Sequence, residues 1–489
     1  MDREEPRHVA IAIIGSGFAG LGIAIRLKQK GIDDFVILER AGDLGGVWRD
    51  NTYPNCACDV ESHLYSFSFA RNPDWTRAFS PQPEIWEYLR SCSDRFGVTP
   101  HLRFGHEVRR LDWDEEKKIW HVETAKENFT ADVVIAAAGG LSEPSIPKLP
   151  GLDSFEGEAF HSAKWNHDVD LAGKRVAVVG TGASAIQFVP AIQPKVGELL
   201  LFQRTPAWIM PRKNPQISEG AKRLLRSSNL AQLLLRGEIY VRHEILALPF
   251  LYPQIAKLVQ IVANHHLKKQ VPDPKLRVKL TPKFTLGCKR ILLSDEYLPA
   301  LTQPNVEVIT SAVAEIRPHS VVDKDGTEHA VDVIIFGTGF QVQEHPLAKR
   351  THGKNGETLW SLWKSRMSAH LGTSVHGFPN LFFLFGPNTA LGHSSVIVMI
   401  ESQIRYVLDA LDHMKRNQLK TIEASQVAQE KFVDEMDRKF KNTVWASGGC
   451  DSWYLDKDRQ NTTLWPGFTF SFMHRMSRFQ PSEYQVARK

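Results

Sequence analysis

A glycine-rich turn between two apolar segments near the start of the chain restricts the fold more than any other feature. Residues 8–14 are small and β-branched, which is typical of a buried strand, and residues 21–30 have the pattern of a helix. The turn between them follows G-x-G-x-x-G and contains Gly15, Ser16, Gly17, Phe18 and Gly20. A second apolar segment, 35–38, leads into Glu39, about 20 residues after the last glycine. This arrangement predicts a dinucleotide site, in which backbone N–H groups approach a pyrophosphate and Glu39 accepts hydrogen bonds from a ribose 2′-OH.

A second unit of the same kind follows further along the chain. Residues 174–179 predict a strand and residues 185–192 a helix, and the turn between them contains Gly180, Thr181, Gly182, Ala183 and Ser184. The next predicted strand, 199–202, is followed by Arg204 and Thr205 and not by a carboxylate. A carboxylate would repel a 2′-phosphate whereas Arg204 would pair with it, so this unit is expected to prefer NADP over NAD. The alternative is an arginine on a solvated loop.

Composition places the chain among globular proteins and excludes several other classes. The hydrophobic share of 42% and the charged share of 24% are close to average, so a disordered, collagen-like or disulfide-scaffold chain is excluded. A net charge of +5 is too small to indicate a nucleic-acid partner. No run of about 18 apolar residues is present, so no transmembrane helix is expected. The early glycine turn stands where a signal peptide would have its cleavage site, and five cysteines fit a reducing compartment, so we expect a cytoplasmic protein.

Two dinucleotide sites in one chain limit the chemistry. Hydride transfer between a nicotinamide and a second redox dinucleotide makes FAD the expected first ligand. Disulfide reductases, flavin reductases and flavin monooxygenases all use this pair of cofactors. A disulfide reductase needs two thiols after the first unit, but Cys56 and Cys58 are separated by one residue, and a disulfide between them would be strained. No second cysteine or histidine pair has zinc-like spacing, so no metal site is expected.

A segment just before the second unit distinguishes these classes. It fits the pattern F-x-G-x-x-x-H-x-x-x-W through Phe155, Gly157, His161 and Trp165. The pattern resembles the fingerprint of type I Baeyer–Villiger monooxygenases, whereas the related N- and S-oxidising flavin monooxygenases usually have Tyr or Phe in place of Trp165. The other segments that resemble this family are residues 45–59, 203–206, 287–290, 337–340 and 378–387.

The resemblance covers about residues 8–470 and implies an α/β fold with two Rossmann-like domains. The FAD-binding domain would combine residues 1–145 with residues 346–489. The NADPH-binding domain would span residues 146–345 and carry a helical insertion at about 215–275. The implied reaction inserts one oxygen atom of O₂ next to a ketone carbonyl and gives an ester or lactone through a C4a-peroxyflavin. An apolar ketone and O₂ are the small-molecule partners that we expect.

The resemblance also implies roles for individual residues. Arg290 matches the family's active-site arginine and would stabilise the peroxide, because arginine keeps its charge when buried. Asp59 matches the carboxylate that would position Arg290. Lys289, with Arg204 and Thr205, would bind the 2′-phosphate of NADPH. The remaining cofactor contacts that it implies are Val47, Trp48, Asp59, Tyr65, Val108 and Trp453.

Several alternatives stay open on sequence alone. The first is a nitrogen- or sulfur-oxidising flavin monooxygenase, against which Trp165 and the pair Lys289 and Arg290 argue. The second is a non-enzymatic module that senses nucleotides. The basic, amphipathic helices of the insertion either cover the active site or form a membrane-surface patch. His161 is expected to couple the linker between the domains to NADPH binding, and not to act as a general base.

Overall fold

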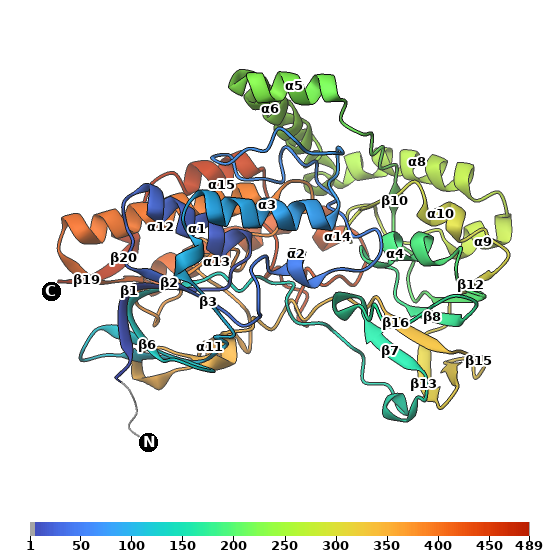
Figure 1. Ribbon diagram of the computed structural model, residues 1–489, viewed down its shortest axis with the longest axis horizontal. Helices are drawn as coiled ribbons and strands as arrows, with labels where there is room; N and C mark the ends of the chain where they lie inside the picture. The colour runs from blue at the N-terminus through green and yellow to red at the C-terminus, as the bar shows by residue number, and fades with distance from the viewer. Residues whose placement is uncertain (1–4, 489) are drawn as a thin grey trace.

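The computed structural model describes residues 5–488, and two largely parallel sheets placed side by side form its framework (Figure 1). In Figure 1 the N-terminal and C-terminal segments, in blue and red, form the part at the left, and the green and yellow middle of the chain forms the part at the right. The first sheet has the strand order β17-β4-β5-β6-β1-β2-β3, and β18 also pairs with β6. Its strands are β1 (Arg7–Ile14), β2 (Phe35–Glu39), β3 (Leu102–Phe104), β4 (Val108–Asp114), β5 (Ile119–Thr124), β6 (Phe129–Ala136), β17 (Thr351–His352) and β18 (Leu381–Phe383).

The central strand β1 is apolar along most of its length because both faces of the first sheet are covered. Ile11 and Ile13 belong to a core shared with α1 and α12, whereas Ala12 and Ile14 belong to a second core on the opposite face, which includes α11. The helix α1 packs against α12, so the returning C-terminal segment completes this part of the molecule. Its helices are α1 (Phe18–Gln29), α2 (Val47–Asp50), α3 (Gln82–Arg95), α11 (Leu359–Trp363), α12 (Val396–Arg416), α13 (Gln426–Phe440), α14 (Val444–Ser447) and α15 (Thr469–Arg475).

The second sheet has five parallel strands in the order β12-β9-β8-β16-β7. They are β7 (Glu158–His161), β8 (Arg175–Val179), β9 (Glu198–Phe202), β12 (Val306–Ile309) and β16 (Val333–Phe336). The helices α4 (Ala185–Ile192) and α10 (Tyr297–Ala300) pack on each other beside this sheet. Three smaller sheets contain β10 (Ile209–Met210) with β11 (Leu292–Leu293), β13 (Val313–Arg317) with β14 (Ser320–Asp323) and β15 (Glu328–Ala330), and β19 (Leu419–Ala424) with β20 (Tyr484–Arg488).

Two chain segments connect the sheets, and they run next to each other. The first is the proline-rich segment 141–150, which contains no helix or strand, and the second follows β16. The Ser145 N–H donates to the Gly339 carbonyl (2.8 Å), and the Gln341 N–H donates to the Glu143 carbonyl (2.9 Å). These bonds tie the outgoing and returning segments together at the boundary between the two sheets.

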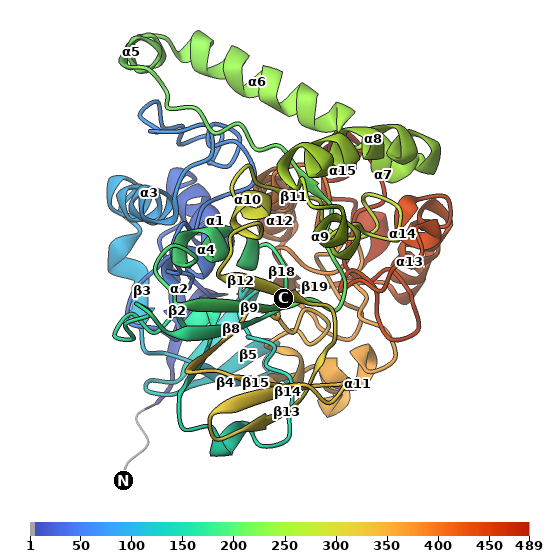
Figure 2. The same cartoon turned by 90° about the vertical axis from the view of Figure 1, so that its right-hand side faces the viewer.

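The predicted helical insertion follows β10 and stands at the outer edge of the molecule (Figure 2). It consists of α5 (Glu219–Ser227), α6 (Asn229–Ile245), α7 (Leu248–Leu251), α8 (Pro253–Gln270) and α9 (Pro274–Lys279). Among residues 5–488, no single helix is long and apolar enough to cross a membrane. The segments 229–251 and 253–270 reach that length and hydropathy only together, and the chain bends by 110° between them.

The α/β fold class predicted from the sequence is confirmed, and the strand ends differ from the expected ones by one or two residues. One feature differs from the expectation of reduced cysteines. Cys288 and Cys450, 162 residues apart in sequence, form a disulfide. Packing of the C-terminal segment against the loop after α9 brings them together, and a cysteine count cannot reveal such a distant pairing.

Candidate active site

A cavity of about 1070 Å³ lies between the two sheets, at the ends of the strands that carry the glycine turns. Loops of both parts of the molecule line it, as is common for cofactor and substrate sites at domain boundaries. Most residues predicted from the sequence line this cavity: Gly15, Ser16, Gly17, Phe18, Glu39, Val47, Trp48, Asp59, Tyr65, Val108, Thr181, Gly182, Ala183, Ser184, Arg204, Thr205, Lys289, Arg290 and Trp453. Five predicted residues do not line it, namely Gly20, Phe155, Gly157, His161 and Trp165.

The first glycine turn, where the chain crosses from β1 to α1, leaves no room for a side chain at Gly15 or Gly20. Gly15 has a φ of +101°, and a Cβ atom there would lie 2.6 Å from the Ala137 carbonyl oxygen. A Cβ atom on Gly20 would lie 1.9 Å from the Gly15 carbonyl oxygen. Gly20 therefore fits the helix against the strand and has no direct place at the cavity.

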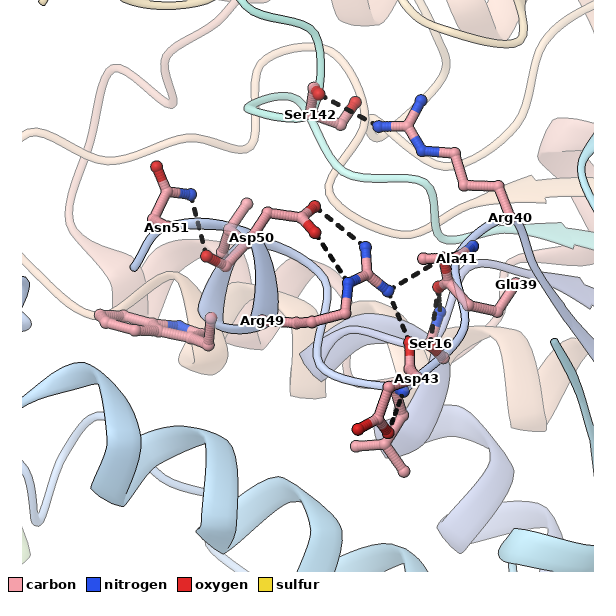
Figure 3. A network of polar contacts seen from close by, with 12 residues as sticks. Ser16, Glu39, Arg40, Ala41, Asp43, Arg49, Asp50, Asn51 and Ser142 are labelled. Atoms are coloured by element: carbon pink, nitrogen blue, oxygen red, sulfur yellow. Dashed lines mark hydrogen bonds and ion pairs between the residues drawn. The ribbon is translucent and has the colours of Figure 1, made fainter. Parts of the chain in front are cut away.

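Glu39 at the end of β2 is buried and held by four contacts (Figure 3). One carboxylate oxygen accepts hydrogen bonds from the Ser16 N–H (3.1 Å) and the Ser16 hydroxyl (2.7 Å). The other accepts from the Ala41 N–H (2.9 Å) and lies 3.1 Å from an Arg49 guanidinium nitrogen. Burial disfavours the charge of Arg49, but Asp50 and Glu39 together raise the pKa of this residue. Sequence analysis missed Arg49, because no spacing rule connects it to Glu39.

The second glycine turn repeats the backbone geometry of the first. Gly180 has a φ of +107°, and a Cβ atom there would lie 2.4 Å from the Gly337 carbonyl oxygen. Behind this turn the Thr181 hydroxyl donates to the Thr205 carbonyl (3.3 Å). The next side chain of interest, Arg204, is exposed and forms no salt bridge with any carboxylate in residues 5–488.

Lys289 brings a second cation to the same region. Burial, followed by the charge of Arg204, lowers the pKa of the Lys289 ammonium group. Two cations that repel each other in this way form a favourable site for a phosphate dianion, which would relieve the repulsion.

Arg290 and Asp59 form an ion pair in the wall of the cavity. The Arg290 Nε and Nη2 atoms donate to the same Asp59 oxygen, at 3.1 and 2.6 Å, and Nη1 donates to the Leu391 carbonyl (3.1 Å). Burial disfavours the charge of Arg290, but Asp59 outweighs this cost and raises the pKa of the guanidinium. The structure thus brings together two residues that lie 231 positions apart in sequence.

Three aromatic residues complete the predicted set. The Trp48 Nε1–H donates to the Tyr65 hydroxyl (3.1 Å), and the two rings meet edge to face with centroids 5.6 Å apart. Trp453 is 44% exposed at the cavity, so it has surface available for a ligand. The disulfide between Cys288 and Cys450 connects the segment of Lys289 and Arg290 to the segment of Trp453.

The sequence matches the family model described as "FMO-like: Flavin-binding monooxygenase-like" over residues 8–443. The chain belongs to the flavin-binding monooxygenase-like family. A Baeyer–Villiger monooxygenase of Streptomyces coelicolor is 50% identical over 483 residues, which are 98% of this chain and 93% of that protein. The resemblance predicted from the sequence motifs is confirmed.

Solved structures agree with this family membership. The crystal structure of cyclohexanone monooxygenase from Rhodococcus sp. Phi1 bound to NADP⁺ matches with a TM-score of 0.87 at 27% identity and covers 99% of this chain and 100% of that chain. The crystal structure of the OTEMO complex with FAD and NADP has a TM-score of 0.88 at 26% identity and covers the same shares of the two chains.

The fingerprint residues of this flavin-binding monooxygenase-like chain lie outside the cavity and build the edge of the second sheet. A Cβ atom on Gly157 would lie 2.3 Å from the Asp332 carbonyl oxygen, so glycine lets β7 approach β16. Trp165 packs between Phe160 and Phe188, each with a ring-centroid distance of 5.3 Å. Burial lowers the pKa of His161, which is 1% exposed.

The thiols near the cavity are buried and not activated. Burial raises the pKa of Cys56 to about 12 and raises the pKa of Cys58 well above its usual value. The Cys58 carbonyl accepts a hydrogen bond from Arg212 (2.9 Å), a half-buried cation that sequence analysis also missed. Arg212 and Asp59 are far apart in sequence, and their charges interact only because the fold brings the two segments together. Within residues 5–488, no group of three metal-ligating side chains is present.

Proposed function

We propose that this chain is an FAD- and NADPH-dependent Baeyer–Villiger monooxygenase that converts an apolar ketone and O₂ into an ester or lactone. The observation that carries the proposal is the ion pair of Arg290 and Asp59 in a cavity bordered by both glycine turns. Relatives named as Baeyer–Villiger monooxygenases, at 50% identity over nearly the whole chain, support the same reaction.

The residues of the two turns fit the two cofactors. The first turn offers backbone that glycines leave open at Gly15 and Gly17, and a fixed carboxylate, Glu39, for the hydroxyl groups of the FAD ribose. The second turn offers the same kind of backbone with Arg204 and Lys289 for the 2′-phosphate of NADPH. When bound, FAD accepts two electrons from NADPH and activates O₂.

Arg290 would stabilise negative charge on oxygen in the cavity. A guanidinium has five N–H donors and keeps its charge at any working pH. Asp59 and the Leu391 carbonyl accept from three of them and fix the plane of the group. The two remaining N–H groups would donate to the reacting oxygen. A cation fixed in this way stabilises developing negative charge more strongly than one that must reorganise.

We further propose that the two cofactors divide the chain. Residues 1–145 and 346–489 would form the FAD-binding domain, residues 146–345 the NADPH-binding domain, and residues 215–275 its helical insertion; residues 1–4 and 489 lie outside the described residues. The strand pairing of β18 with β6 and the packing of α12 on α1 support the assignment of the C-terminal segment to the first domain. The cytoplasmic location stays a prediction from the sequence.

Product analysis tests the reaction type. The purified protein with FAD and NADPH is incubated with cyclic, linear and aryl ketones and, separately, with an aryl sulfide. Esters or lactones from at least one ketone, with oxygen and NADPH consumed in equal amounts, are the expected result. Sulfoxide as the main product, with all ketones unchanged, would assign the chain to heteroatom oxidation. No turnover with any substrate, together with tight nucleotide binding, would favour a sensing module.

A further inference from the structure

Several large apolar side chains on the outer face of α6 and α8 are exposed and have no packing partner among the described residues that would bury them. We define the α6–α8 surface by Leu230, Leu234, Val241, Ile245, Leu258 and Ile261, each between 57% and 66% exposed. The four residues on α6 follow a spacing of three to four residues or its multiple, so they share one side of the helix. In both views α6 and α8 lie at the same outer edge of the molecule (Figures 1 and 2).

The charge of the chain is concentrated in the same segment. Residues 219–270 contain eight Lys and Arg against three Asp and Glu, an excess of five. This excess equals the net charge of the whole protein, so the remaining residues are neutral in sum. An exposed apolar stripe with this basic surplus has the composition of a helix that lies in a membrane interface.

Ion pairs account for several charges of the segment, including Arg226 with Asp74 (2.5 Å) and Arg242 with Glu61 (2.7 Å) outside it. Glu219 pairs with Lys222 (2.9 Å), and Glu238 pairs with Arg242 (3.1 Å). By contrast, Lys257, Lys268 and Lys269 on α8 form no salt bridge with any carboxylate in the described part of the chain. These three positive charges are available to an external anion.

A hollow on α8 adds a place for such an anion. It has a volume of about 310 Å³, and two lysines, Lys257 and Lys283, line it together with the amides of Gln260 and Asn264. Ile261 of the α6–α8 surface borders the same hollow. Cationic and amide donors beside an exposed apolar side chain match a phosphate headgroup above an acyl chain.

We propose that the α6–α8 surface docks on an anionic phospholipid bilayer, with α6 and α8 lying in the plane of the interface. The bend of 110° between the two helical segments excludes a straight span and fits helices that lie flat. A second copy of the chain is the less favoured occupant, because it would bring two basic surpluses of the same sign together. An anionic bilayer supplies the opposite charge.

The short helix α7, which lies between α6 and α8 in the chain, contacts segments beside the cavity. Phe250 of α7 packs against Gly287 and Gly392. A Cβ atom added to either glycine would lie 3.0 to 3.3 Å from the Phe250 ring. These glycines flank Arg290 and Leu391, which line the cavity.

Vesicle sedimentation of the FAD-loaded protein tests the proposal. Vesicles of phosphatidylcholine alone are compared with an equimolar mixture of phosphatidylcholine and phosphatidylglycerol. Binding to the mixed vesicles should be at least about tenfold stronger and should weaken with salt. In the variant Lys257→Ala, Lys268→Ala, Lys269→Ala, the affinity for the mixed vesicles should fall by about fivefold for each lysine removed. The variant Leu234→Gln, Leu258→Gln should lose binding to both kinds of vesicle.

A matched control uses another helix with the same kinds of residue. Val427, 74% exposed, and Lys431, also exposed, lie on α13, so the variant Val427→Gln, Lys431→Ala should bind vesicles as the parent protein does. The proposal would be overturned if the parent protein bound neither kind of vesicle. It would also be overturned if the lysine variant bound the mixed vesicles as strongly as the parent protein does. A doubled mass in light scattering that Leu234→Gln, Leu258→Gln abolishes would assign the surface to a second copy of the chain.

Discussion

The two glycine turns share one backbone geometry and carry opposite side chains at the end of the following strand. Gly15 and Gly180 have φ values of +101° and +107°, and in each case a Cβ atom would lie only 2.6 or 2.4 Å from a carbonyl oxygen. Glu39 after the first turn is 4% exposed and already holds four contacts. Arg204 after the second turn is exposed and has no carboxylate partner among residues 5–488.

The comparison indicates how the same backbone geometry can suit two different nucleotides, depending on the side chain that follows the next strand. A neutral ribose hydroxyl is recognised by an acceptor whose position is fixed in advance, which is what the buried Glu39 provides. A charged 2′-phosphate attracts cations without such preparation, and Arg204 with Lys289 can adjust to it when it arrives. In the proposed function, the ion pair between the turns, Arg290 and Asp59, would serve the oxidation step.

The largest expected effect is the loss of ester formation in Arg290→Ala, with cofactor binding retained. Arg290→Ala should retain FAD and NADPH-dependent reduction, because both turns are unchanged. Ester formation should fall by about 10²- to 10³-fold, since one fixed donor to a developing oxyanion is worth about 2.7–4 kcal/mol. Anaerobic stopped-flow reduction paired with aerobic product yield measures the two half-reactions, and oxygen that is consumed should appear as hydrogen peroxide.

The control for this variant is Arg290→Lys, which keeps the charge. It should restore little ester formation, because a flexible ammonium group does not reproduce the planar fork of donors that contacts Asp59 and Leu391. Near-parental ester formation by either variant would remove Arg290 from the oxidation step. Loss of FAD from both would show that Arg290 is structural.

The second prediction concerns the coenzyme preference that Arg204 gives to the second turn. Arg204→Ala should weaken NADPH binding by about 10- to 150-fold, because charge-assisted hydrogen bonds contribute about 1.5–3 kcal/mol. Use of NADH should stay nearly unchanged, since NADH has no 2′-phosphate. Michaelis constants for both coenzymes give the answer, and equal losses for NADPH and NADH would contradict the assignment.

A smaller effect concerns the pH dependence of NADPH binding. The lowered pKa of Lys289 means that its charge is lost at a lower pH than that of an ordinary lysine. The Michaelis constant for NADPH should therefore rise at alkaline pH, by about tenfold at most, while that for NADH stays flat. Arg204→Ala removes one cause of the shift and should move the midpoint to higher pH. A midpoint that does not move would show that the two cations are independent.

The smallest effect is expected at the fingerprint. Trp165→Phe removes part of a packed ring that does not line the cavity. The Michaelis constant for NADPH should change by less than about threefold, while the melting temperature falls by a few degrees. A change of tenfold or more in NADPH binding at an unaltered melting temperature would give Trp165 a direct role.

Much of the framework follows from local sequence. The apolar segments around Gly15 and Gly180, the helices behind them and the residues Glu39 and Arg204 were all identified by spacing. The helical insertion was also predicted from periodicity, with bounds close to those of α5 through α9. Such patterns are readable because a βαβ unit is specified by residues that are near one another in the chain.

Other features depend on contacts that no local pattern encodes. The Glu39 contact with Arg49 and the disulfide between Cys288 and Cys450 arise only when separate loops meet. The fingerprint motif pointed to the right family, yet its residues build a sheet edge and not the cavity wall. Motif matching records which residues occur together, and it does not record which of them face a ligand.

By itself, the sequence determined that two dinucleotide-binding turns stand in one α/β chain, and it determined the charge that each turn offers. The tertiary structure decided that Asp59 and Arg290, 231 residues apart, meet at 2.6 Å between these turns. It also decided that the apolar side of α6 faces outward and not into a core. The physical reason is the range of the interactions: glycine turns and strand alternation act over a few residues, whereas a buried ion pair and an exposed helix face depend on how distant segments pack.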